Sequence, residues 1–429
     1  MKNNIKYLVI FLLLGLFVIS CKKKEDNTTD LASLSFANKT VNQSKTDLEN
    51  AGSQMVGEMQ TLESGDGIKV VSSFSNLTNT SDPFSTTKSA LLTNVKNTSQ
   101  LTSATTMFGY LRAGVQESTD TTLEQVFTTY KGVYTWNFTS KKWNKTTATD
   151  RIEFDFPSTK TGTTNNAKMV ITYQGIKGVN LIKDYHGDMP AKFDNSIYVN
   201  GTLVAEYNLT ATYNSDGTPS SVVYFVALNP FKFQVSLTYN ASSASLKYSF
   251  TDNSKTIVEC YAGVNGKLDK TTIQKDSIQD IISNANAYFQ VFNIKLAGKI
   301  DYKTLYANVN AITKNTKLTE AQADTAGAAA INKSMVLVLI YADSQQKIAQ
   351  AEFYPSTRTY TYYDYYDRPY TETDSYIDIR FIFTDKSKGD LKTYFRTGFQ
   401  DLVNDINNFI AKINTDFDGN IQPIVYNSK

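Results

Sequence analysis

Apolar and polar residues alternate along much of the chain between residues 131 and 264, and a period of two predicts β-strands. The alternation is regular over residues 203–213 and again over residues 231–239. Asn200-Gly201 and Asp216-Gly217 are typical of hairpin turns, because both central residues of such a turn take a positive φ. We therefore expect an antiparallel meander whose strands bury one face and expose the other.

Residues 31–130 lack this alternation, and we expect them to be helical and loosely packed. The first helix has a narrow apolar stripe that repeats every seven residues, at Val41, Leu48, Met55 and Leu62. A loop rich in serine, threonine and asparagine follows, and Pro83 interrupts it. Thr121-x-x-Glu124 then has the spacing of a capping box and predicts a short helix before the first strand.

Helices are also predicted among the later strands. Apolar residues from Ile278 to Leu296 fit a period of 3.6, so we expect one helix there that ends at Gly298. Thr319-x-x-Gln322 predicts the capped start of an alanine-rich helix. A last helix is expected from Leu391 to Ile413, where the apolar stripe is wide enough to need a sheet as its partner.

Strand patterns return over residues 335–354, with a hairpin at Asp343-Ser344, and over residues 358–385. Each block of strands is thus a meander followed by an amphipathic helix. The predicted fold class is α+β, with a large curved antiparallel β-sheet and amphipathic helices packed on one face. Residues 131–429 would form this sheet with its helices as one assembly, or as two sub-domains that meet near residue 270.

The composition supports an extended sheet. The chain contains 27 tyrosines and 24 phenylalanines, which favour strands, and its many threonine, serine and asparagine residues suit an exposed polar face. Of the 43 basic residues, Lys2 and Lys6 precede Cys21, which leaves 41 against 41 acidic residues from Cys21 onward. Because nucleic-acid binders need a basic surface, this balance argues against nucleic acid as a partner.

Residues 1–20 predict a signal for export. Basic residues come first, an apolar run from Tyr7 to Ile19 follows, and Ser20 precedes Cys21. The run is shorter than the roughly 20 residues that span a bilayer comfortably. A cysteine in this position resembles the lipobox of bacterial lipoproteins, in which the thiol is acylated and becomes the mature N-terminus. An uncleaved anchor helix with a chance cysteine is the alternative.

Val18-Ile19-Ser20 departs from the common lipobox and is similar to the looser form found in lipoproteins of the Bacteroidota. The charged run from Lys22 to Asp26 resembles the signal that sends such lipoproteins to the outer-membrane surface. Residues 21–30 would then be the lipidated cysteine and a polar tether. The resemblance implies a lipid-anchored protein of the cell outer membrane, on either its surface or its periplasmic side.

A second resemblance lies in the strand region. Gly132-Val-Tyr134-Thr-Trp136 and Ile152-Glu-Phe154-Asp-Phe156-Pro157 look like a stretch found in Bacteroidota lipoproteins of uncharacterised activity. This resemblance implies a location and no activity. A curved sheet with helices also resembles periplasmic lipoprotein carriers in outline, which is an analogy of fold alone.

One predicted hairpin is crowded with aromatic and charged residues: Tyr360, Tyr362, Tyr363, Asp364, Tyr365, Tyr366, Asp367, Arg368 and Tyr370. The tyrosines fall on both faces of a strand, so they cannot all belong to a core. Such a cluster is suited to stacking on sugar rings or to a protein contact, since tyrosine is favoured at interfaces. Alternatively, amphipathic tyrosines simply cover a sheet edge and its solvent face.

The best metal-like pattern follows the last predicted helix, with oxygen-bearing side chains at alternate positions: Asn414, Asp416, Asp418 and Asn420. This spacing matches the first half of an EF-hand loop. The position of the bidentate glutamate holds Val425, and Pro423 blocks a following helix. A capped helix end with a turn therefore explains the pattern more simply, and no metal or cofactor is expected.

Catalytic candidates are few. His186 is the only histidine, and its neighbours Gly187 and Pro190 favour a surface loop over a general base or a metal ligand. Glu153 and Asp155 share one side of a strand and could mimic the two carboxylates of a glycosidase, but we expect them on the solvated side of that strand. Cys260 is the only cysteine besides Cys21, so no intrachain disulfide is expected, and we interpret it as buried.

The sequence thus predicts a non-enzymatic, lipid-anchored outer-membrane protein with a binding or structural role. Its ligand is a glycan, a lipid or a protein, and its oligomeric state is open. One alternative is a carrier that holds an apolar lipid in a cavity between sheet and helices. Another is a hydrolase that uses paired carboxylates.

Overall fold

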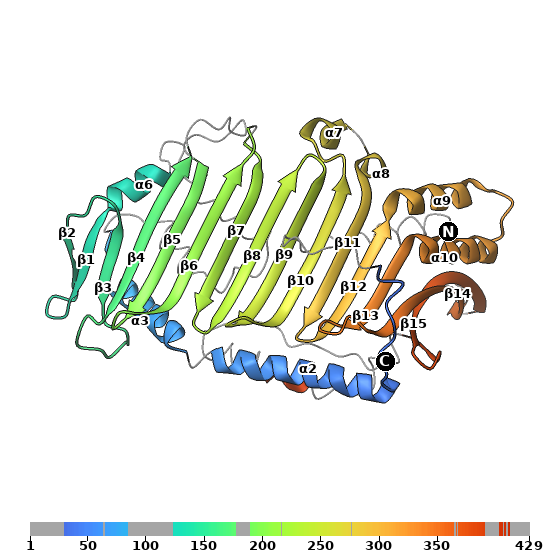
Figure 1. Cartoon of the computed structure of the whole chain (residues 1–429), viewed down its shortest axis with the longest axis horizontal. Helices are drawn as coiled ribbons and strands as arrows, with labels where there is room; N and C mark the ends of the chain where they lie inside the picture. The colour runs from blue at the N-terminus through green and yellow to red at the C-terminus, as the bar shows by residue number, and fades with distance from the viewer. Residues whose placement is uncertain are drawn as a thin grey trace. The chain divides into compact units, whose positions relative to one another are not determined.

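The computed structural model describes residues 30–62, 65–84, 123–176, 189–215, 217–275, 277–363, 366, 368–390, 403–405, 407–408 and 411. Its strands form a 16-stranded sheet that is mostly antiparallel (Figure 1). From β3 to β16, neighbours in the sheet are also neighbours in the sequence, which confirms the predicted meander. At the other edge β1 lies between β2 and β3 and pairs with β3 in parallel, so the sheet is mixed. The predicted α+β class is confirmed.

The chain divides into two compact units. Unit 1 comprises Met1–Gly57, Asn240–Ser245 and Ile257–Lys429, and unit 2 comprises Glu58–Tyr239 and Leu246–Thr256. The helices and most strands of unit 2 are α3 (Asp66–Thr80), α6 (Leu123–Tyr130), β1 (Gly132–Asn137), β2 (Lys142–Thr146), β3 (Ile152–Phe156), β4 (Ala167–Ile176), β5 (Met189–Val199), β6 (Thr202–Tyr213), β7 (Pro219–Leu228) and β8 (Phe231–Asn240). Residues of β9 (Ser243–Asp252) fall in both units.

The core of unit 2 forms where α3 packs on the first strands. The apolar residues of α3 recur three to four positions apart, and Phe74 among them is buried. Its ring lies 5.1 Å from the rings of both Phe154 and Phe156 on β3. Ser73 on the same side of α3 donates a hydrogen bond of 2.7 Å to the carbonyl of Pro157. The alternating residues of β3 therefore meet a helix on one face of the sheet.

Unit 1 holds the remaining elements: α2 (Val41–Leu62, with its last residues in unit 2), β10 (Lys255–Gly266), α7 (Lys270–Lys275), α8 (Ile278–Ile281), β11 (Ile282–Val291), β12 (Ile294–Asp301), α9 (Tyr302–Lys314), α10 (Glu320–Ser334), β13 (Met335–Tyr341), β14 (Lys347–Tyr363), β15 (Pro369–Phe383) and β16 (Lys388–Asp390). The predicted helix of residues 41–62 and the hairpin at Asp343-Ser344 are confirmed. The last predicted helix and the residues before Leu123 that would cap α6 lie largely outside the described residues.

The single helix predicted over residues 278–296 is wrong. Only α8 is helical there, and β11 and β12 follow, joined at Phe292, whose φ is +46°. The helical turn α8 runs directly into β11, and Ile281, Ala285 and Phe289 lie four residues apart across their junction, so the helical turn and the apolar face of β11 together imitate a helical period. Gly298, predicted to end a helix, lies within β12 and pairs with Leu337.

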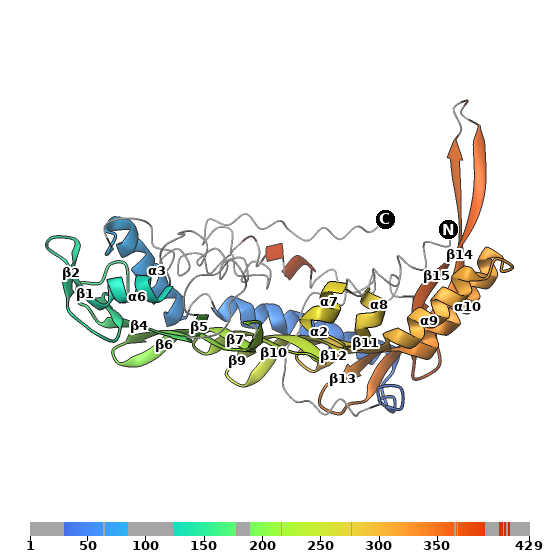
Figure 2. The same ribbon diagram turned by 90° about the horizontal axis from the view of Figure 1, so that it is seen from above.

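Helices α9 and α10 pack on one face of the strands of unit 1 (Figure 2). Asp301 caps α9 by accepting a hydrogen bond of 3.0 Å from the backbone of Thr304. The predicted capping box of α10 is confirmed, since Thr319 and Gln322 each accept a hydrogen bond from the other's backbone. Leu305 and Ile331 are buried between these helices and the sheet.

Helix α2 covers the same face of these strands. Its residue Leu48 packs with Leu339 of β13. Leu339 and Met335 point to the same side of β13, and Met335 belongs to the core beneath α10. At the end of β13 the hydroxyl of Tyr341 donates a hydrogen bond of 2.6 Å to Asp47 of α2. Burial opposes the charge of Asp47, but hydrogen bonds from Lys39 and Tyr341 outweigh it and lower the pKa of the carboxyl. In unit 1 the helices α2, α9 and α10 thus lie on one face, as predicted.

We expect Ile331→Ala to lower the free energy of unfolding by about 2–5 kcal/mol, because it leaves a cavity in a fully buried position beneath α10. Urea unfolding followed by circular dichroism measures the change. The exposed variant Lys314→Ala on α9 is the control and should change stability by about 0.5 kcal/mol or less. Equal stability of the two variants would contradict the packing of α10 on the sheet.

Candidate functional site

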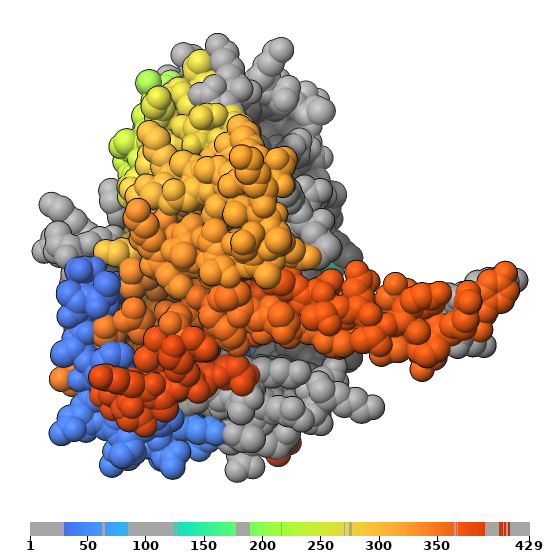
Figure 3. All heavy atoms as spheres, turned by 90° about the vertical axis from the view of Figure 1, so that its right-hand side faces the viewer, coloured from blue at the N-terminus to red at the C-terminus, as the bar shows by residue number. Residues whose placement is uncertain are grey.

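Strands β14 and β15 continue past the rest of unit 1 as a two-stranded ribbon. β14 pairs with β13 only near its start, between Val338↔Gln350 and Ile340↔Lys347. Its pairing with β15 extends much further, to Tyr363↔Pro369. Figures 2 and 3 show this part as a narrow projection. We call residues 354–363 and 369–378 the tyrosine ribbon.

The two faces of the tyrosine ribbon differ in chemistry, because successive side chains of a strand point to opposite sides. One face carries aromatic and charged residues: Arg358, Tyr360, Tyr362, Tyr370, Glu372 and Asp374. The other face carries paired hydroxyl residues and one tyrosine: Thr357, Thr359, Thr361, Tyr363, Thr371, Thr373 and Ser375. The prediction that the tyrosines occupy both faces is confirmed, and most of them share one face.

The tyrosines of this aromatic face support one another. Tyr362 and Tyr370 are directly opposite across the strands, and their rings stack with centres 5.6 Å apart and planes 18° apart. The ring of Tyr360 lies 6.3 Å from that of Tyr362. Tyr362 remains 47% exposed, Tyr363 67% and Tyr366 73%. The ribbon therefore presents ordered aromatic area to solvent.

Charged residues hold the aromatic face in place. The hydroxyl of Tyr360 donates a hydrogen bond of 3.1 Å to Glu372, directly opposite it. Burial, with the hydrogen bond to Glu372 and the charge of Asp374, raises the pKa of Tyr360 to about 12. Arg358 lies 3.5 Å from Asp374 and 5.9 Å from the ring of Tyr360. Tyr360 thus stays a neutral donor at physiological pH.

The base of the ribbon is protected against the addition of another strand. The side chain of Asn332 on α10 donates a hydrogen bond of 2.7 Å to the carbonyl of Phe353 and accepts one of 2.9 Å from the backbone amide of Phe353. Two residues later Pro355 offers no amide hydrogen. Both features hinder the pairing of a further strand with this edge of β14. Partners are therefore expected to contact the side-chain faces of the ribbon.

The structure brings most of the predicted tyrosine cluster together. Arg368 lies 5.3 Å from the ring of Tyr366 at the tip. Asp364, Tyr365 and Asp367 lie outside the described residues. Cys21 and His186 also lie outside the described residues. The same holds for the residues of the metal-like pattern: Asn414, Asp416, Asp418 and Asn420. Within the part of the chain that the structure describes, no group of three or more His, Cys, Asp or Glu is placed to hold a metal ion.

Glu153 and Asp155, the paired acids, are joined by one lysine. Lys168 bridges Glu153 and, at 3.2 Å, Asp155, while Arg151 lies 2.7 Å from the other oxygen of Glu153. The side chain of Glu153 is only 7% exposed. Burial opposes its charge, but hydrogen bonds from Lys168 and Arg151 outweigh it and lower the pKa of Glu153. A general acid needs the opposite shift, so this geometry favours a structural ion pair.

Cys260 is buried in β10, as predicted. Burial and the neighbouring charge of Glu259 raise the pKa of its thiol to about 11. Because the thiolate is the reactive form, this cysteine suits a structural role.

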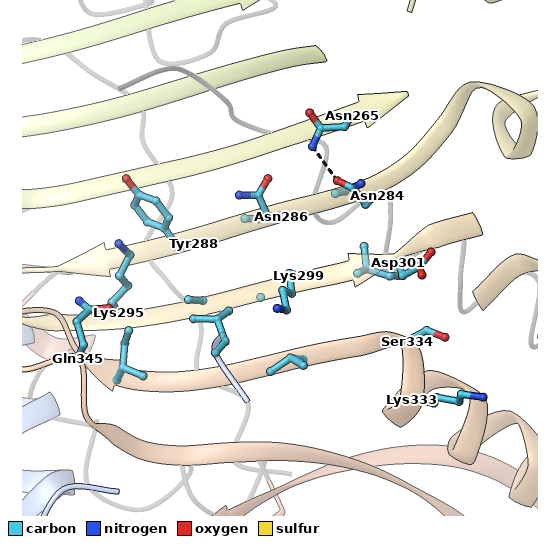
Figure 4. Close-up of a pocket in the computed structure, with 18 residues that line it drawn as sticks. Asn265, Asn284, Asn286, Tyr288, Lys295, Lys299, Asp301, Lys333, Ser334 and Gln345 are labelled. Atoms are coloured by element: carbon cyan, nitrogen blue, oxygen red, sulfur yellow. Dashed lines mark hydrogen bonds between the residues drawn. The ribbon is translucent and has the colours of Figure 1, made fainter. Parts of the chain in front are cut away.

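Sequence reasoning missed a groove on the face of unit 1 opposite to its helices. The side chains around it include Asn284, Asn286 and Lys299 (Figure 4). These residues alternate at a period of two along β11 and β12. That alternation was a usable signal, but the helix predicted over residues 278–296 obscured it.

The sequence matches no protein-family profile and no curated protein significantly. None of the described helices is both long and apolar enough to span a membrane.

Glu153→Gln is expected to lower the free energy of unfolding by about 1–3 kcal/mol at neutral pH, because Arg151 and Lys168 lose their shared carboxylate. The folded-state pKa of Glu153 lies below its ordinary value of 4.5, so its stabilisation is complete above that value. The stabilisation is lost as the pH falls through the folded-state pKa. Urea unfolding of wild type and variant should therefore converge as the pH is lowered.

Asp66→Asn serves as the control for this prediction, since its ion pair with Lys69 is exposed and should contribute about 0.5 kcal/mol or less. A difference between wild type and Glu153→Gln that stays constant down to about pH 3 would contradict the ion-pair assignment.

Proposed function

We propose that this protein is a lipid-anchored lipoprotein of the cell envelope that binds another protein through its tyrosine ribbon, without a catalytic role. The observation that carries the proposal is the exposed set of tyrosines on a projecting hairpin, in which Tyr362 stacks on Tyr370 and Tyr360 lies beside Tyr362. Tyrosine and arginine dominate the binding energy of protein interfaces. Tyrosines are concentrated on this ribbon, and Arg358 lies among them.

The ribbon is suited to binding because little entropy is lost when it docks. Tyrosine has only two rotatable side-chain bonds, and Tyr360 and Tyr362 are already restrained by neighbours. Tyr362 and Tyr370 cover one ring face of each other. The covered ring faces therefore favour an interdigitated protein contact through the exposed ring edges over flat stacking on a sugar ring, which is the glycan alternative.

The lipid anchor rests on the resemblance of Ser20-Cys21 to a lipobox. Acyl chains contribute about 0.8 kcal/mol per buried methylene, so a thiol and an amine that both carry acyl chains would hold the protein at a membrane. The outer membrane is the proposed location. The polar run that begins at Lys22 would be the tether between the lipid and Asp30.

Two other functions have less support. A carrier of apolar lipid needs a cavity between sheet and helices, whereas Val309, Ile331 and Phe353 pack together in that space in unit 1. A hydrolase with paired acids needs one protonated carboxyl, whereas cations neutralise Glu153. The packed core and the paired cations both favour a binding role.

The ribbon is tested by Tyr362→Ser with Tyr370→Ser, with Thr359→Ser and Thr373→Ser on the opposite face as the matched control. A photo-crosslinking amino acid placed at Tyr366 should trap a discrete protein in intact cells. With that protein purified, the tyrosine variant should bind about 30-fold more weakly, equal to about 2 kcal/mol, and the control should bind as wild type. Equal affinity of both variants, or retention on glycans instead, would overturn the proposal.

The anchor is tested by Cys21→Ser. Wild type should incorporate labelled palmitate and partition with membranes, while the variant should take up no label, because position 21 then lacks the thiol that is acylated. Globomycin should cause the wild-type precursor to accumulate. Labelling that persists in the serine variant would refute lipidation at Cys21.

A further inference from the structure

The face of unit 1 opposite α2, α9 and α10 has a regular pattern that the strand registers define. On β10, β11 and β12 every second residue points to this face, and the rows run across the strands. The first row is Asn265, Asn284 and Asp301, and the second is Gly263, Asn286, Lys299 and Val336. The third is Tyr261, Tyr288, Ala297 and Val338, and the fourth is Glu259, Gln290, Lys295 and Ile340.

A groove of about 560 Å³ lies on this face (Figure 4). The groove runs along small residues of this pattern, and Ala297 is one of the residues that line it. Beside it a Cβ at Gly263 would lie 2.5 Å from the hydroxyl of Tyr261, so a larger residue there would displace the Tyr261 side chain. Its volume falls within the roughly 300–1,000 Å³ typical of small-molecule sites.

A rigid wall closes one end of the groove. The ring of Tyr288 stacks on Tyr261, with centres 5.3 Å apart, and the ammonium of Lys295 lies 3.6 Å from the centre of the Tyr288 ring. The hydroxyl of Tyr288 is hydrogen-bonded to Glu259. These contacts fix the wall without help from a ligand.

The other end of the groove holds polar groups that could form hydrogen bonds with a ligand. Asn265 donates a hydrogen bond of 2.7 Å to the amide oxygen of Asn284, which leaves the amine of Asn284 as a donor within the described structure. Ser334, just before β13, also lines the groove. It is 7% exposed, and its buried hydroxyl has no hydrogen-bond partner among the described residues. An unpartnered buried hydroxyl is costly unless a ligand or water satisfies it.

Lysines outnumber acids in the lining of the groove, where Lys295, Lys299 and Lys333 stand against one acid, Asp301. Lys299 also lies 3.3 Å from Asp30, in an ion pair whose side chains are 47% and 56% exposed, so an anionic ligand can replace Asp30 at little cost. The carboxylate of Asp301 already accepts hydrogen bonds from the amide and the hydroxyl of Thr304. Amides that donate and accept suit adjacent hydroxyl groups, and lysines suit a carboxylate or phosphate. The lining therefore matches a sugar that carries a negative charge.

The N-terminal segment leaves the fold beside this groove. Leu31 lines it, and Leu31 and Leu34 pack on Val338 and Ile340 of the same face. Lys347 fastens the segment by donating a hydrogen bond of 3.0 Å to the carbonyl of Ala32. Cys21 precedes Asp30 closely in the sequence, and this stretch spans about 30 Å at most when fully extended. A lipid on Cys21 would therefore keep the groove near the membrane surface.

We propose that this groove binds a negatively charged sugar, presented as the headgroup of a glycolipid in the membrane that holds the anchor. The specificity for an acidic sugar stands on the groove alone. The membrane source of that sugar rests on the proposed function, because it requires lipidation at Cys21.

The test uses the full chain with Cys21→Ser, so that binding is measured independently of the anchor. Vesicles of phosphatidylcholine contain either glucuronosyl diacylglycerol or phosphatidylglycerol, which has equal charge and no sugar ring. Co-flotation should be at least tenfold stronger with the glucuronosyl vesicles. Any insertion of residues 1–20 is common to both vesicle types and cancels in the comparison. A second arm titrates free glucuronate and glucose by nuclear magnetic resonance, and glucuronate should bind the tighter.

The groove variant is Asn286→Ala with Lys299→Gln, and it should lose at least tenfold in both arms. Its control is Asn310→Ala with Lys303→Gln on α9, away from the groove, which should bind as the parent chain. Circular dichroism checks that both variants fold. Equal flotation with both anionic vesicles, equal binding of glucose and glucuronate, or an unaffected groove variant would overturn the site. Binding of free glucuronate without flotation would overturn the membrane source, whereas failure of palmitate labelling alone would overturn the anchor.

Discussion

The antiparallel register between consecutive strands is the constraint on which the other features of this protein depend. Side chains alternate along each strand, so the register decides which residues share a face. In unit 1 this places Ala285 and Leu339 beneath helices and Asn286 and Val338 on the opposite face. A slip of one residue would move lysines and asparagines into the helix-covered core, at a cost that several buried apolar residues could not offset.

The tyrosine ribbon shows how one strand pair serves both packing and recognition. Near its start β14 contributes the buried residues Ala349 and Phe353 to the core beneath the helices. Beyond Pro355 the same alternation continues, but no helix of the described structure provides a core, and the side chains become tyrosine and threonine. Asn332 lies where the core ends and the ribbon begins. Its side-chain amide forms hydrogen bonds with the backbone of Phe353, beyond the last residue of β14 that pairs with β13. Recognition is therefore left to side chains.

Two carboxylates of restricted exposure in the described structure have partners, whereas one buried hydroxyl at the groove has none among the described residues. Glu153 is nearly buried yet compensated by two cations, and Asp47 is held by Lys39 and Tyr341. Such compensated groups stabilise the fold without being available for chemistry. Ser334 differs, because its hydroxyl is buried at a groove without a partner in the described chain. What sets Ser334 apart is its place in the groove lining, where a ligand or a water can satisfy the hydroxyl.

Local patterns in the sequence determined the strands of the meander, the capping box at Thr319 and the clustering of tyrosines around Tyr362, because each depends on neighbours a few residues apart. The resemblance of Ser20-Cys21 to a lipobox also rests on a local pattern, and both the lipobox and lipidation at Cys21 stay predictions. Residues 278–296 were misjudged, since the apolar residues of α8 and of one face of β11 together imitate a helical period. Only the tertiary structure decided that Asn286 and Lys299 share a groove with Ser334, or that Tyr362 stacks on Tyr370. The physical reason is that cross-strand register and helix packing bring together residues whose separation in the sequence carries no information about contact.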